Sequence, residues 1–426
     1  MFGHFKLVYP APISEPIQSR DSNAYMMETL RNSGLNLKND FGIGRKIWRV
    51  FSFTYNMVIL PVSFPINYVI HLAEFPPELL LQSLQLCLNT WCFALKFFTL
   101  IVYTHRLELA NKHFDELDKY CVKPAEKRKV RDMVATITRL YLTFVVVYVL
   151  YATSTLLDGL LHHRVPYNTY YPFINWRVDR TQMYIQSFLE YFTVGYAIYV
   201  ATATDSYPVI YVAALRTHIL LLKDRIIYLG DPSNEGSSDP SYMFKSLVDC
   251  IKAHRTMLKC SFCDAIQPII SGTIFAQFII CGSILGIIMI NMVLFADQST
   301  RFGIVIYVMA VLLQTFPLCF YCNAIVDDCK ELAHALFHSA WWVQDKRYQR
   351  TVIQFLQKLQ QPMTFTAMNI FNINLATNIN VSPLLSVRTG KEAKSELQSL
   401  QVAKFAFTVY AIASGMNLDQ KLSIKE

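Results

Sequence analysis

The sequence predicts an all-α integral membrane protein with seven transmembrane helices, a cytosolic N-terminus and a cytosolic helical anchor region. The 426-residue chain is 53% hydrophobic and only 16% charged, whereas soluble domains carry about 25% charged residues. Its apolar residues gather in runs of about 20, the length that crosses the hydrocarbon core of a bilayer. Strand-type alternation is absent, which favours a bundle of helices over a barrel.

Six apolar runs are long enough to span a membrane. They lie at about 50–71, 79–103, 139–161, 183–206, 266–295 and 302–326. A seventh span, 365–416, is expected to be interrupted by a charged insert at 381–401. Residues 1–49 contain no early apolar core of the signal-peptide kind, so the first span is expected to serve as its own insertion signal.

The basic residues between the runs predict the orientation. The N-terminal segment and the loops on its side of the membrane contain 27 Lys and Arg residues, against six on the other side. Such an imbalance puts the N-terminus in the cytosol, and seven spans then put the tail 417–426 outside. This orientation argues against a G-protein-coupled receptor. It also explains the net charge of +8 better than nucleic-acid binding does.

The two sides differ in bulk. On the predicted cytosolic side, residues 207–228 and 241–264 favour helices that extend the bundle. Residues 327–364 are predicted to form an anchor region around an amphipathic helix at 345–360, with its apolar residues on one face. The outer side has one substantial loop, 162–182, which is rich in aromatic residues and long enough to fold over the bundle.

No catalytic signature appears, so no enzyme activity, cofactor or metal site is predicted. The pairs Cys260/Cys263 and Cys319/Cys322 have C-x-x-C spacing, but a structural zinc ion needs four ligands. We interpret these cysteines as small packing residues. The predicted topology places no cysteine in an extracellular loop, so disulfides are not expected.

Ionisable residues within the spans are candidates for function. Lys96 is expected to snorkel toward the cytosol, and Asp158 to lie at the outer interface. Glu190, about two turns inside the outer boundary, is the best candidate for a ligand cavity. The alternative is that Glu190 pairs with a polar neighbour.

The outer halves of the second to fourth spans are apolar and aromatic, as pockets for small ligands are. Tyr148, Ala152 and Thr155 share one helical face, and Tyr191 and Gly195 share another. An aromatic stripe at helical spacing is equally compatible with packing. The predicted ligand-binding residues are Trp91, Tyr148, Ala152, Thr155, Glu190, Tyr191 and Gly195.

The C-terminal hundred residues resemble the insect odorant receptor family. The resemblance rests on "FPLCFYCNAIVDDCKELAHALFHSAWW", "QPMTFTAMNIFNINLATNIN" and "VAKFAFTVYAIASGMN". The phrase "SGTIFAQFIICGSILG" and the length of the N-terminal segment extend it over nearly the whole chain. The related gustatory receptors carry a T-Y-h-h-h-h-h-Q-F signature in the last span, which is missing here.

The resemblance implies a heterotetrameric, ligand-gated cation channel in the plasma membrane of olfactory dendrites. This chain would be the tuning subunit, which binds volatile odorants and assembles with a shared co-receptor. The last helix of each subunit would line the pore, with Thr408, Ala411, Ile412 and Gly415 facing it. Small residues on this face suit a hydrophobic gate, and they equally suit close helix packing. A transporter is a further alternative, although no inverted repeat is visible.

The segment Val381–Gln401 does not fit the last span. It carries five charges, at Arg388, Lys391, Glu392, Lys394 and Glu396, and each would cost roughly 2.5–3.5 kcal/mol at the centre of a membrane helix. Joining Asn380 to Val402 restores the family pattern without a gap. Val-Ser and Gln codons can encode splice-donor and splice-acceptor sequences. We therefore interpret the segment as a retained intron or a genuine splice form that does not conduct.

Overall fold

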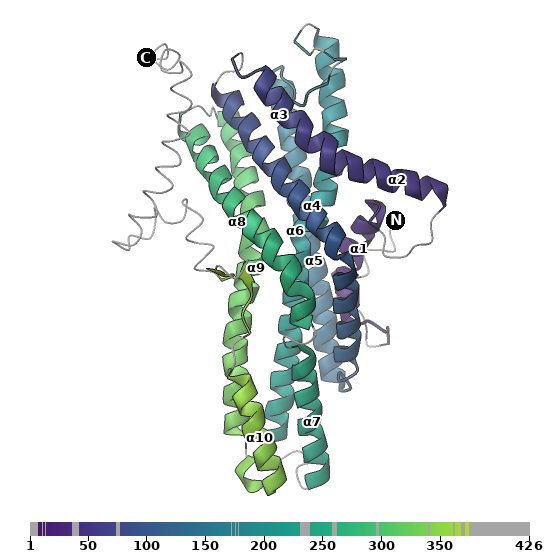
Figure 1. Ribbon diagram of the computed structural model, residues 1–426, viewed down its shortest axis with the longest axis vertical. Coiled ribbons are helices and arrows are strands. Elements are labelled where there is room, and N and C mark those ends of the chain that lie inside the picture. Colours follow the sequence, from purple (N-terminus) through teal and green to yellow (C-terminus); the bar gives the residue numbers. More distant parts are fainter. Residues whose placement is uncertain are drawn as a thin grey trace, which may run out of the picture.

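The computed structural model describes most of the chain before residue 375 (Figure 1). The described residues are 7–10, 12, 14–35, 42–73, 77–171, 173–174, 176–177, 179–230, 239–257, 262–294, 298–339, 341–360, 363–367 and 371–374. Long helices dominate this part, which confirms the predicted all-α class. The seven-span count and the orientation stay predictions.

The described elements follow one another along the chain in this order. They are η2 (Ser19–Asn23), α1 (Ala24–Asn32), α2 (Ile43–Thr54), η3 (Tyr55–Ile59), α3 (Leu60–Ile70), α4 (Pro77–Asp118), α5 (Pro124–Leu161), α6 (Arg180–Gly230), α7 (Pro240–Met257), α8 (Phe262–Leu294), α9 (Gln298–His338), η4 (Trp341–Val343), α10 (Lys346–Leu359), β1 (Thr366–Ala367) and β2 (Phe371–Asn372).

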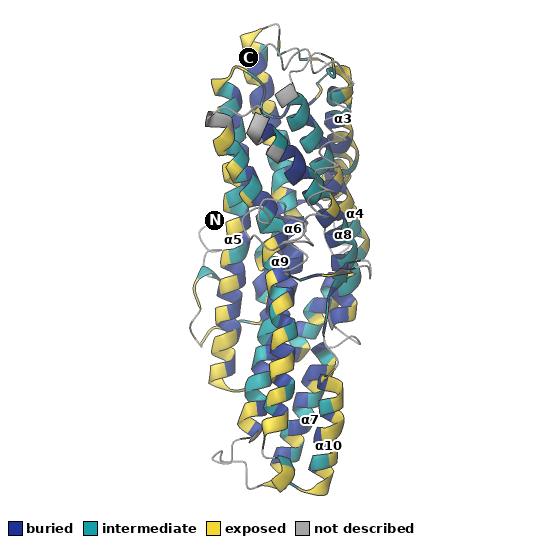
Figure 2. Cartoon of the chain, turned by 90° about the vertical axis from the view of Figure 1, so that its left-hand side faces the viewer, coloured by how far each residue is buried: buried dark blue, intermediate teal, exposed yellow. Residues whose placement is uncertain are grey.

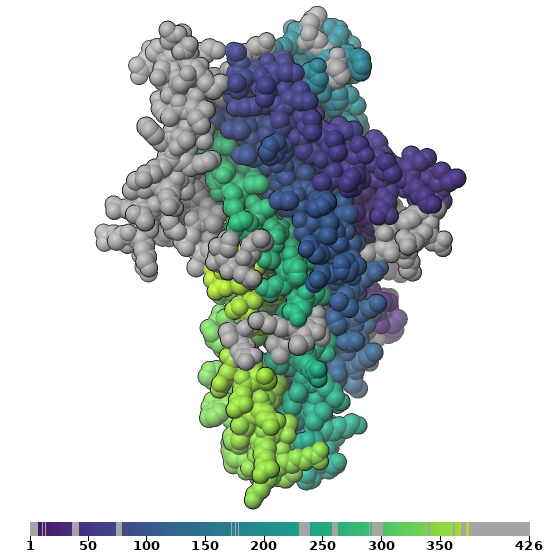
Figure 3. Space-filling model, in the orientation of Figure 1, coloured from purple at the N-terminus to yellow at the C-terminus, as the bar shows by residue number. Residues whose placement is uncertain are grey.

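The bundle is longer than a bilayer is thick. The 51 residues of α6 span about 75 Å at 1.5 Å per residue, more than twice the roughly 30 Å hydrocarbon core. The predicted span 183–206 and the predicted helix 207–228 are parts of one continuous helix, α6. The helix α7 packs against the far half of α6, and α10 packs against α9, at the bottom of Figures 1 and 3.

Five helical stretches among the described residues are long and apolar enough to cross a membrane. They are Ile43–Ile70, Leu79–Asp118, Pro124–Leu161, Cys263–Ile288 and Arg301–Val343. The predicted fourth span lies in α6, which is not among them and whose outer half carries Gln186, Glu190 and other polar residues. Apolar side chains such as Phe98 and Val146 are also exposed on the outer faces of these helices. Long apolar helices with exposed apolar side chains indicate a multi-pass membrane protein.

The core runs along the axis of the bundle (Figure 2). Fully buried aromatic side chains mark its middle and lower parts, among them Phe114, Tyr207 and Tyr211. Phe114 and Tyr211 stack with ring centroids 5.9 Å apart. A second, smaller apolar cluster around Leu285, Tyr307 and Val311 joins α8 and α9 in the upper part.

The start of the predicted seventh span is not helical. Residues 366–367 and 371–372 instead form a two-residue antiparallel pair in which Thr366 faces Asn372. Thr and Asn disfavour helices because their side chains compete for backbone hydrogen bonds. The expected start near residue 365 is therefore wrong. The remainder of that span, with the 381–401 insert, lies outside the described residues.

Candidate functional site

A cavity of about 90 Å³ lies where the outer ends of four helices meet. The start of α4, the end of α5, the end of α8 and the start of α9 surround it, and residues 164–168 of the following loop cover it. Because all four ends belong to the side predicted to be extracellular, the cavity lies on the side from which a volatile ligand is expected to arrive.

The cavity is lined by aromatic and apolar side chains with a few polar groups among them. Tyr151 and Tyr307 form one wall, with ring centroids 5.0 Å apart. Asn168 and Asn291, which are 6% and 2% exposed, also line it, and neither side-chain oxygen has a hydrogen-bond partner among the residues that the structure describes. Buried acceptors without partners are uncommon, so these two oxygens are available to a donor group that enters.

The covering loop is held in place by Glu190 of α6. Its fully buried carboxylate accepts hydrogen bonds from the backbone N–H groups of Tyr167 at 2.8 Å and Thr169 at 2.9 Å. Gln186, one turn earlier, donates to the same carboxylate at 2.9 Å and to the Thr169 carbonyl at 3.1 Å. The carboxylate therefore fixes the loop over the cavity and does not face a ligand.

The rim of the cavity carries an ion pair. Arg164 donates to the Asp158 carboxylate at 2.8 Å, and the Asp158 side chain is 26% exposed. Gly159, next to this pair, packs so closely on the loop that a Cβ would lie 2.8 Å from the Arg164 carbonyl oxygen. Any larger residue at position 159 would push the loop away from the end of α5.

Beneath the cavity and the second apolar cluster lies a closed ring of buried hydrogen bonds. Lys96 donates to Asp205 and, at 2.6 Å, to Gln277. Gln277 donates to Gln314, which donates to the Tyr148 hydroxyl at 2.8 Å. Tyr148 closes the ring by donating to Asp205 at 2.5 Å. The five residues come one each from α4, α6, α8, α9 and α5, so this polar ring ties five helices together.

The seven predicted ligand-binding residues do not form one site. Thr155 lines the cavity, and Ala152 is buried one turn below it in α5. Tyr148 belongs to the polar ring, and Glu190 holds the loop. These four positions all lie within or next to the upper core.

The other three lie elsewhere. Trp91 is 60% exposed, and its indole N–H donates to the Pro61 carbonyl of α3 at 3.0 Å. Tyr191 is half-buried and packs edge-on against Phe192. Gly195 is half-buried and is not among the residues that line this cavity. The proposed pore residues Thr408, Ala411, Ile412 and Gly415 lie outside the described residues.

The snorkelling expected of Lys96 is wrong. The residue is 3% exposed, and its ammonium group is satisfied inside the bundle by Asp205 and Gln277. Asp205 was not among the predicted site residues, although Lys96 and Asp205 both belong to apolar segments of the sequence. Two opposite charges at similar depth in different apolar segments were the signal that could have revealed this pair. The cavity residues Tyr151, Asn291 and Tyr307 had no signal beyond their apolar surroundings.

Comparisons with known proteins agree on one family. The family model described as "7tm Odorant receptor" matches residues 77–384. The chain is 94% identical to Odorant receptor 43b of Drosophila melanogaster over 426 residues, covering all of both chains. It is 35% identical to Odorant receptor 42a of the same species, covering 99% of this chain and 98% of the relative.

A solved structure has the same fold. The insect olfactory receptor OR5 from Machilis hrabei matches with a TM-score of 0.73 at 14% identity, over 86% of this chain and 96% of that one. The same receptor in complex with eugenol matches with a TM-score of 0.67. At this level of identity the likeness concerns the fold alone.

Proposed function

Since the chain belongs to the odorant receptor family, we propose that it binds small volatile molecules in the outer cavity and, together with a co-receptor, gates a cation channel. The observation that carries the proposal is the cavity itself. It combines aromatic walls with two unpaired acceptors under a pinned loop. This is the chemistry of a pocket for small, mostly apolar ligands with one polar group.

The size of the cavity suggests how binding is linked to gating. Ligand pockets usually measure roughly 300–1,000 Å³, whereas this one measures about 90 Å³. A ligand must therefore displace the walls, of which α5 and α9 are two. A conformational change follows only if the ligand prefers the expanded state, and filling a widened cavity supplies that preference.

The polar ring connects the walls of the cavity to the other helices of the bundle. Tyr148 lies one turn below Tyr151 on α5, and Gln314 lies two turns below Tyr307 on α9. Movement of either cavity wall therefore acts on the ring, through which five helices are connected. In the proposed assembly these helices would move the last span, which lines the pore, in a plasma membrane that holds the heterotetramer.

The test is co-expression with an insect odorant co-receptor in cells that lack both, with currents recorded against a panel of volatiles. The chain without residues 381–401 should conduct, and the chain as written should give little current. Equal currents from both would contradict the interpretation of the insert. Flux without the co-receptor would indicate a transporter. An N-terminal tag accessible on intact cells would indicate a G-protein-coupled receptor topology.

A further inference from the structure

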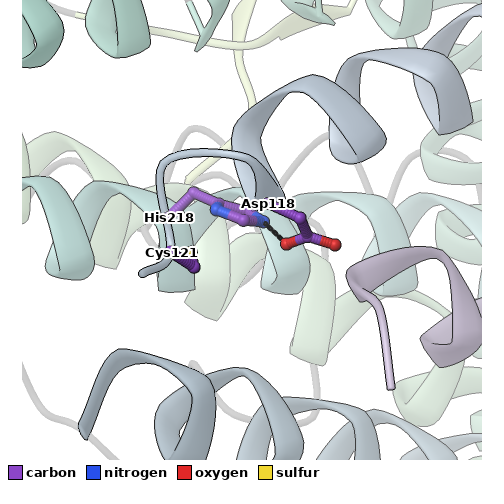
Figure 4. A group of neighbouring side chains, drawn as sticks. All are labelled: Asp118, Cys121 and His218. Carbon is purple, nitrogen blue, oxygen red and sulfur yellow. Dashed lines mark ion pairs between the residues drawn. The ribbon is translucent and has the colours of Figure 1, made fainter. Parts of the chain in front are cut away.

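Three potential metal ligands meet in the lower half of the bundle (Figure 4). Asp118 is the last residue of α4, Cys121 lies in the turn before α5, and His218 comes from the second half of α6. One carboxylate oxygen, the thiol sulfur and one imidazole nitrogen all lie within 4.8 Å of one another. Cys121 is 7% exposed and His218 is 4% exposed.

The hydrogen bonds within the protein do not neutralise the negative charge of the Asp118 carboxylate. The Asp118 carboxylate accepts hydrogen bonds from the backbone N–H of Ser19 at 2.7 Å and from its hydroxyl at 2.6 Å. Within the described part of the chain it pairs with no lysine or arginine, and the Nε2 nitrogen of His218 is 3.9 Å away. A bound cation would compensate a carboxylate that is mostly buried.

The set of donor atoms suits zinc. One carboxylate oxygen, one thiolate and one imidazole are all ligands that Zn²⁺ accepts. With Zn²⁺ bound, the carboxylate and thiolate bring the net charge of the site to zero. Arg225 lies 3.3 Å from the Cys121 sulfur, and its own charge is balanced by Glu126 at 2.6 Å.

The separation between the Asp118 and His218 ligand atoms is close to what zinc requires. Bonds of about 2.0–2.3 Å around a tetrahedral ion put neighbouring ligand atoms about 3.3–3.8 Å apart. The Asp118 Oδ1 to His218 Nε2 separation of 3.9 Å needs little adjustment. The Ser19 hydroxyl lies between these two atoms, 2.9 Å from Nε2. A rotation of its side chain opens the central position, and Ser19 or water then supplies the fourth ligand.

We propose that Asp118, Cys121 and His218 form a Zn²⁺ site that joins the end of α4 to α6. The site shares no residue with the cavity or the polar ring, so it is independent of the proposed odorant binding. Metal binding there holds the end of α4 against α6 and competes with the Ser19 hydroxyl for His218.

The test is a Co²⁺ titration of the full chain purified in detergent. Bound Co²⁺ should give the thiolate-to-cobalt and tetrahedral absorption bands, and Zn²⁺ should remove them. Cys121→Ser and His218→Ala should each weaken binding at least about tenfold. Cys250→Ser and His254→Ala are matched controls, because these residues are also buried but lie outside the cluster, and both should leave the bands unchanged.

A second measurement needs no variant. Zn²⁺ should slow the alkylation of Cys121 in the unaltered chain, as followed by mass spectrometry, and a chelator should reverse the effect. The rate at Cys250 should not change. Absence of cobalt bands together with unprotected Cys121 would overturn the proposal, as would full binding by a folded Cys121→Ser chain.

Discussion

The outer and inner ends of the bundle are built differently. The outer end contains a cavity, acceptors without partners and a loop pinned by one carboxylate. At the inner end, ion pairs such as Arg216–Asp328 at 2.7 Å and Arg225–Glu126 at 2.6 Å join helices around stacked aromatic rings. We therefore expect the outer end to repack around a ligand more readily than the inner end, which ion pairs and stacked rings hold in shape. The polar ring lies at the boundary between them.

Breaking the polar ring should have the largest effect. Asp205→Asn leaves the buried Lys96 charge without its partner, which typically costs about 3–5 kcal/mol. We expect a large loss of surface expression and a lower unfolding temperature of the purified chain. Asp158→Asn, which breaks a partly exposed pair, is the control and should cost about 1 kcal/mol or less. If the Asp205→Asn chain and the original chain were equally stable, the polar ring would not be a stabilising boundary between the outer and inner ends.

Releasing the loop should have the next largest effect. Glu190→Ala leaves the N–H groups of Tyr167 and Thr169 without their acceptor, at about 1–3 kcal/mol. We expect faster proteolysis within residues 162–179 and weaker odorant responses. Tyr191→Phe changes a neighbouring residue that makes no such contact and should behave like the original chain. Unchanged proteolysis in Glu190→Ala would argue against a loop held by this carboxylate.

Acid should weaken the inner end through its buried histidines. Burial lowers the pKa of His254 to about 4, from an ordinary value near 6.5. Between these values the unfolded chain binds more protons, so stability falls as the pH falls, by about 1.4 kcal/mol per pH unit for each such histidine. Unfolding temperatures at pH 7.5 and 5.5 measure the loss. His254→Phe should reduce this loss of stability at acid pH. An unchanged pH dependence would show that protonation of His254 does not cause the loss.

Changing a cavity acceptor should have the smallest effect. Asn291→Leu removes an unpaired oxygen that a ligand hydroxyl can reach, and such a hydrogen bond contributes about 0.5–1.5 kcal/mol. We expect the half-maximal concentration to rise about two- to tenfold for ligands with a hydroxyl group and to stay unchanged for hydrocarbons. Asn323→Leu, far from the cavity, is the control. Equal shifts for both ligand classes would indicate a change in packing instead.

Composition and the length of the apolar runs were enough to predict the class of the molecule. Hydrophobicity and run length are local properties, and they predict membrane helices because a bilayer requires about 20 apolar residues per span. They placed five of the spans on helices that are long and apolar enough. The C-terminal motifs indicated the family that the comparisons show.

Which residues contact one another could not be predicted in this way. Lys96 and Asp205 are 109 residues apart, and no periodicity shows that one neutralises the other. Thr155 lines the cavity while Trp91 faces outward, although both belong to apolar outer halves. The physical reason is that helical spacing predicts which residues share a face, whereas the rotation and register of the packed helices decide what that face contacts.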